Sequence, residues 1–89
     1  MVTKQLMHKA ITFTNKYIDN INVITKVEKF KSHLTIYITI WSMNSKYELV
    51  DCIMSRAVDI FGPEKFDSKT KYLEEEIKNG LKLLKNEGT

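Results

Sequence analysis

Large aliphatic side chains occupy every second position from Leu34 to Ile40, and the positions between and just after them hold only threonine, tyrosine or tryptophan. A period of two predicts a β-strand with one buried face. Residues 21–30 alternate less strictly, and only a short polar link around Lys31 and Ser32 separates the two segments. We therefore expect the two segments to form an antiparallel hairpin.

Three further segments repeat their apolar residues at the three-and-four spacing of an amphipathic helix. The first covers residues 3–19 and begins at a threonine that can cap it. The second covers residues 45–61; it opens with a Ser-Lys-Tyr-Glu sequence that has the form of a capping box, and Gly62–Pro63 ends it. The third covers residues 67–84. The predicted fold is therefore α+β, in the order αββαα, with helices covering one face of the hairpin.

Glycine at position 80 lies inside the third predicted helix, where it costs about 1 kcal/mol relative to alanine. A glycine retained at this cost is consistent with a close contact between the helix and its neighbour.

The length of 89 residues predicts a single domain, residues 1–89, with a thin hydrophobic core. A hairpin of two strands is marginally stable by itself, and the sequence pattern predicts no third strand. We therefore expect a homodimer in which a hairpin edge pairs with its copy.

The composition predicts a cytoplasmic protein. Cys52 is the only cysteine, the first residues lack the apolar region of a secretory signal, and no apolar run reaches the roughly 18–20 residues that span a bilayer. Lysine supplies 13 of the 14 basic residues, and isoleucine is abundant, which is typical of a low-GC genome.

No residue pattern points to catalysis. Cys52, His8 and His33 fall in three different predicted elements and show no metal-ligand spacing, and the glycines form no phosphate-binding loop. We therefore expect a non-enzymatic protein without a metal or cofactor.

Acidic residues supply the first candidate binding surface. In the predicted second helix, Glu48, Asp51 and Asp59 fall on one stripe, and Glu74 and Glu75 lie near the start of the third helix. These residues would suit a basic protein partner. We expect a protein-binding modulator, of the kind with which phages or mobile elements of low-GC bacteria inhibit a host protein such as a DNA-binding protein.

The predicted hairpin supplies the alternative surface. Residues 1–46 carry seven lysines and only two acidic residues. Lysines beside aromatic residues on a sheet are typical of proteins that stack nucleic-acid bases and neutralise phosphates. The candidate nucleic-acid-binding residues are Lys26, Lys29, Lys31, Tyr37 and Trp41.

Overall fold

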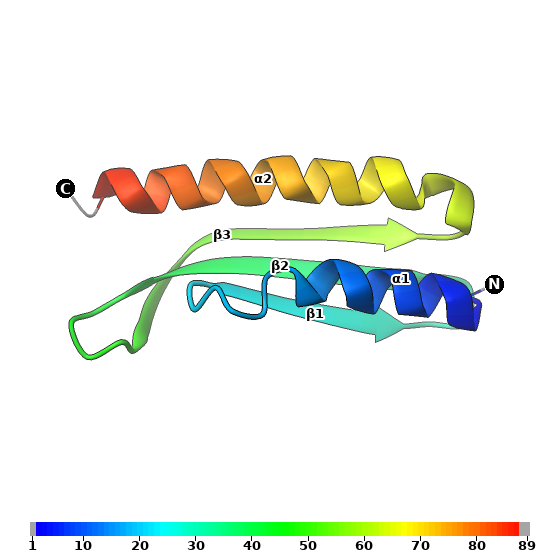
Figure 1. Cartoon of the computed structure of the whole chain (residues 1–89), viewed down its shortest axis with the longest axis horizontal. Helices are drawn as coiled ribbons and strands as arrows, with labels where there is room; N and C mark the ends of the chain where they lie inside the picture. The colour runs from blue at the N-terminus through cyan, green and yellow to red at the C-terminus, as the bar shows by residue number, and fades with distance from the viewer. Residues whose placement is uncertain (1, 88–89) are drawn as a thin grey trace.

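The computed structural model describes residues 2–87, which form two helices and one antiparallel three-stranded sheet (Figure 1). The elements follow in the order α1 (Lys4–Asn15), β1 (Val23–Lys29), β2 (Leu34–Met43), β3 (Leu49–Ile60), the short 3-10 turn η1 (Pro63–Lys65) and α2 (Phe66–Glu87). The predicted α+β class is therefore confirmed. Thr3 caps α1, because its hydroxyl accepts a hydrogen bond of 3.1 Å from the Leu6 amide.

The strands lie in the order β1-β2-β3, so each neighbour in the sequence is also a neighbour in the sheet. Helix α1 packs on β1, and α2 packs on β2 and β3. The core between the helices and the sheet contains Ile36, Ile38 and Ile40 of β2, all fully buried, together with Phe13 of α1 and Leu73 of α2. The strict alternation in β2 thus gives the sheet one face that the helices cover.

The predicted middle helix is wrong, because residues 49–60 form strand β3. Met54, Val58 and Ile60 are buried against the core, and the residues between them are exposed. The buried positions are separated by even numbers of residues, as the period of two in a strand requires. Met54 and Val58 are four residues apart, which fits a helix as well as a strand. The pairing with β2 decides between the two, and a period within residues 49–60 alone does not reveal it.

The predicted capping box at residues 45–48 is instead the turn between β2 and β3. The Asn44 side chain organises this turn, because its Oδ1 accepts hydrogen bonds from the amides of Lys46 (2.9 Å) and Glu48 (3.0 Å). Tyr47 takes a positive φ of 62°, as tight turns require. A serine and a glutamate three residues apart do not therefore start a helix here.

Val50 and Phe61, two large apolar residues of the segment predicted as the middle helix, lie outside the core. Val50 is 52% exposed and Phe61 is 59% exposed. The third strand also removes one reason for expecting a homodimer, because the sheet reaches three strands within one chain.

An ion pair links β3 to α2. Arg56 of β3 donates a hydrogen bond of 2.8 Å from its Nε to Glu76 of α2, and this contact lowers the pKa of the Glu76 carboxyl below its ordinary value.

Across the residues that the structure describes, no helix combines the length and the apolar character needed to cross a bilayer.

Candidate functional site

The face of the sheet opposite the helices carries a band of aromatic side chains. Tyr37 and Trp41 lie on this face because they alternate along β2 with the buried isoleucines. The register of β1 and β3 with β2 adds three more rings at one end of the sheet. We call this surface the aromatic face; its rings belong to Phe30, His33, Tyr37, Trp41 and Phe61.

Three of these rings form a continuous stack. The His33 imidazole lies between Phe30 and Phe61, with centroid distances of 4.8 Å on each side and interplanar angles of 16° and 29°. Phe30 is 39% exposed and Phe61 59% exposed, although such large apolar side chains usually bury more of their surface. The stack therefore exposes apolar ring surface to solvent.

A hydrogen bond between the side chains of Thr35 and Asp59 lies beside His33 of the stack. Thr35 donates a hydrogen bond of 2.6 Å from its hydroxyl to Oδ1 of Asp59, its neighbour across the strands. Nε2 of His33 lies 3.8 Å from the same oxygen. Thr35 is only 4% exposed, although no helix covers this side of the sheet. Contacts within the chain therefore order the side chains of His33, Thr35 and Asp59 in the absence of a partner.

The centre of the aromatic face carries few charged side chains. Lys26 lies opposite Tyr37 in the register, and its Nζ is 5.6 Å from the centre of the tyrosine ring. The same ammonium group forms an ion pair of 3.1 Å with Glu28. Trp41 donates a hydrogen bond of 2.9 Å from its indole nitrogen to the Thr39 hydroxyl, which fixes the ring over the strand.

The structure brings together part of the predicted nucleic-acid site. Lys26, Tyr37 and Trp41 share the aromatic face, as the alternation along the strands predicts. Lys29 shares its register position with the buried Leu34, on the helix side, and residue 31 lies in the turn between β1 and β2.

The sequence interpretation missed the three stacked rings. Phe30 continues the period of two that begins at Lys26 and Glu28, so it could have been placed on this face. His33 shares the alternation of Tyr37 and Trp41, but Phe61 lay in a segment predicted as a helix, so the local pattern could not bring it together with the other two rings.

The predicted acidic stripe does not exist, because its residues lie on a strand and a turn. Asp51 and Asp59 lie near opposite ends of β3, about 26 Å apart at the usual rise per residue. Glu48 belongs to the turn before β3, where its carboxylate accepts from the Asn44 side chain at 3.5 Å. A stripe of this spacing requires 3.6 residues per turn, and a strand has a period of two.

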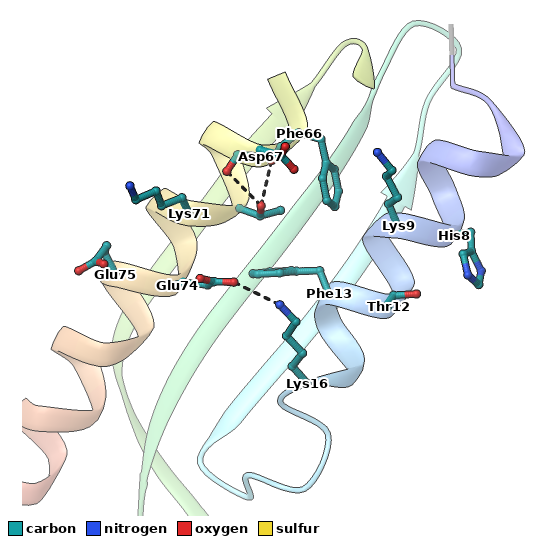
Figure 2. A pocket seen from close by; sticks show the side chains of 11 residues that line it. His8, Lys9, Thr12, Phe13, Lys16, Phe66, Asp67, Lys71, Glu74 and Glu75 are labelled. Carbon is teal, nitrogen blue, oxygen red and sulfur yellow. Dashed lines mark hydrogen bonds and ion pairs between the residues drawn. The ribbon is translucent and has the colours of Figure 1, made fainter. Parts of the chain in front are cut away.

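The other two predicted acidic residues line a groove between α1 and α2 (Figure 2). Phe13 and Phe66 supply apolar surface there, and Glu74 and Glu75 come from α2. Lys16, which follows the last residue of α1, reaches across the groove to Glu74, with 3.3 Å between Nζ and Oε1. Glu74 is therefore already paired within the chain, so the groove does not present the excess of negative charge that a basic partner needs.

Burial is the main reason why the pKa of the Tyr17 hydroxyl lies above its ordinary value, and the charge of Glu74 adds to this effect.

In the described part of the chain, no three histidine, cysteine or acidic side chains gather in a group that could hold a metal ion. Cys52 is exposed, and its thiol donates a hydrogen bond of 3.3 Å to the Met54 carbonyl oxygen.

No family model, curated protein or solved structure matches this chain. The aromatic face is the surface on which the structure gathers the largest number of exposed or half-exposed rings, and it combines residues of β2 with residues next to the ends of all three strands. We therefore take the aromatic face as the candidate functional site.

Proposed function

We propose that this chain is a small non-enzymatic protein-binding domain that holds its partner on the aromatic face. The observation that carries the proposal is a band of five rings on a sheet face that neither helix covers. Aromatic residues are enriched in the cores of protein interfaces, where they provide a large contact area with few rotamers to immobilise. The stacked end of the band is already ordered, so binding costs it little conformational entropy.

The charge on this face favours a protein over a nucleic acid. Along the paired strands, the charged side chains at positions of the uncovered face are Lys26, Glu28 and Asp59. One lysine, already paired with a glutamate, gives no excess of positive charge to neutralise phosphates. Interface cores are depleted in charge, as the centre of this face is.

The proposal does not include a basic host DNA-binding protein as the partner. That expectation depended on Glu48, Asp51 and Asp59 sharing one helical stripe, and the strand β3 separates them. The chemistry of the aromatic face instead fits a partner that offers apolar and hydroxyl-bearing side chains.

The decisive experiment is affinity capture from a low-GC bacterial lysate treated with nuclease, comparing variants of the aromatic face. We expect the double variant Tyr37→Ala/Trp41→Ala to lose the partner, because an interfacial aromatic residue that contributes about 2 kcal/mol weakens binding roughly 30-fold when it is removed. Tyr47→Ala is the matched control, since Tyr47 is 77% exposed and lies in the β2–β3 turn, away from this face. Capture that survives in the double variant, with both proteins melting cooperatively, would contradict the proposal.

Single-stranded nucleic acid is the second candidate ligand, and the contact between Lys26 and Tyr37 is the observation that favours it. Trp41 is the only tryptophan, so its fluorescence reports on the aromatic face alone. We expect no quenching when single-stranded oligonucleotides are titrated into the protein at moderate salt. Quenching that disappears as the salt concentration rises, and that fails in the Tyr37→Ala variant, would replace the protein partner by nucleic acid.

A further inference from the structure

Strand β3 forms the longer edge of the sheet. It pairs with β2, and its 12 residues contain neither lysine nor proline. Its charged residues are Asp51, Arg56 and Asp59, and Nη1 of Arg56 donates a hydrogen bond of 2.8 Å to the Ser55 carbonyl. Strand β1, at the other edge, has 7 residues and carries Lys26 and Lys29. Long edges that lack lysine and proline readily pair with another strand, and natural proteins usually block them. The difference points to β3 as the edge that receives a partner strand.

The backbone hydrogen bonds show which groups face this open edge. The Trp41 amide donates to the Asn22 carbonyl, and the Phe30 amide donates to the His33 carbonyl, both at 2.8 Å. Because the backbone polar groups of successive residues point to opposite sides of a strand, the odd-numbered residues of β2 direct theirs toward β1. The even-numbered residues of β2 therefore direct theirs toward β3.

The register carries this alternation across to β3. Ile38 pairs with Arg56, so the even-numbered residues of β3 bond to β2. The N–H and C=O groups of Ser55, Ala57 and Asp59 consequently point away from the sheet. These odd-numbered residues also have their side chains on the uncovered face.

We propose that β3 pairs in antiparallel fashion with β3 of a second copy of this chain, about a two-fold axis that passes through Ala57. In this register the two Ala57 residues exchange both backbone hydrogen bonds. The Ser55 hydroxyl of each copy lies opposite the Asp59 carboxylate of the other, and Ile53 lies opposite Phe61. The Asp59 carboxylate uses Oδ1 for Thr35, so Oδ2 can accept from the serine of the second copy.

Other registers of the same pairing are less favourable. An axis through Arg56 would place two guanidinium groups directly opposite each other, and an axis through Asp59 would do the same with two carboxylates. An axis through Val58 would place Asp59 opposite Ala57, which offers its carboxylate no side-chain donor. The sequence of β3 thus complements itself better about Ala57 than about Arg56, Val58 or Asp59, and this self-complementarity favours a second copy over an unrelated strand.

The surface beside β3 has room for the second strand. An open groove of about 860 Å³ runs between β3 and the first turns of α2, and Ala57 and Asp59 form its strand side. Tyr72, 46% exposed, lines the helix side with Lys69. An incoming β3 would cover Tyr72 and Phe61, which the single chain leaves exposed.

The resulting dimer would contain one sheet of six strands. The aromatic faces of the two copies would lie on the same side of that sheet, because a two-fold axis perpendicular to a sheet keeps its faces distinct. The inference goes beyond the proposed function, since it concerns self-association and needs no other partner.

Sedimentation velocity over a wide concentration range tests the pairing without any partner present. We expect the wild type to sediment as a species of twice its 10.4 kDa. Ala57→Lys places two lysines opposite each other at the axis, so the dimer should be lost. Ala57→Pro should also give a monomer, because proline removes an N–H that points away from β2 and leaves the pairing within the chain intact.

A mixture of two variants separates a second copy from any other occupant. Ala57→Asp alone should be monomeric, and mixing it with Ala57→Lys should restore the dimer, because opposite charges then meet at the axis. The control is Ile24→Lys, which adds a lysine at an exposed position on the same face of β1 and should remain dimeric. A monomeric wild type would overturn the proposal and leave the edge to a strand of another protein. Folded Ala57→Lys and Ala57→Pro variants that stay dimeric would overturn it as well.

Discussion

The Ile38→Asp variant is expected to remain unfolded at room temperature. Ile38 is fully buried at the centre of β2, facing the helices. An unpaired carboxylate there costs several kcal/mol, and the lost apolar contacts add to this cost. A domain of this size has a total stability of only about 4–13 kcal/mol. Circular dichroism during heating should therefore show no cooperative transition.

The neighbouring residue provides the control for this variant. Thr39 lies on the uncovered face of the same strand and is half-buried. Thr39→Asp introduces the same charge into the same strand, but solvent can reach it, so we expect the variant to melt cooperatively. If Ile38→Asp melts like the wild type, the helices do not cover this face of β2.

The sequence predicted the elements whose periodicity has only one interpretation. The strict alternation from Leu34 to Ile40 excludes a helix, and α1 and α2 have apolar faces that no strand would produce. Residues 49–60 fit both periods over part of their length. The β-branched Val50, Ile53, Val58 and Ile60 favour a strand, and this preference should have outweighed the capping signals on either side.

The candidate site was predictable only where it depends on local alternation. Tyr37 and Trp41 were placed together because they follow one another on one strand. The stack of Phe30, His33 and Phe61 depends on the register of three strands, and assigning β3 to a helix removed that register. The acidic site failed for the same reason, since Glu48, Asp51 and Asp59 were expected to share one stripe only on a helix.

The contact expected at Gly80 is confirmed. Gly80 is buried where α2 crosses the sheet, and a Cβ atom added there would lie 2.5 Å from Cδ1 of Ile40 and 3.0 Å from the sulfur of Met54. Both neighbours are themselves buried, so they have little space into which to move. The glycine therefore sets the distance between α2 and the strands below it.

Gly80→Val should lower the free energy of unfolding by about 3 kcal/mol, because overpacking a core of this kind costs about 1–3 kcal/mol and valine adds three carbon atoms at the contact. The melting temperature should then fall by roughly 10–20 °C. The matched control is Lys78→Val, which places the same β-branched residue at an exposed position of the same helix and should cost only the difference in helix propensity, below about 0.7 kcal/mol. Equal melting temperatures for the two variants would mean that α2 does not approach β2 and β3 closely at this residue.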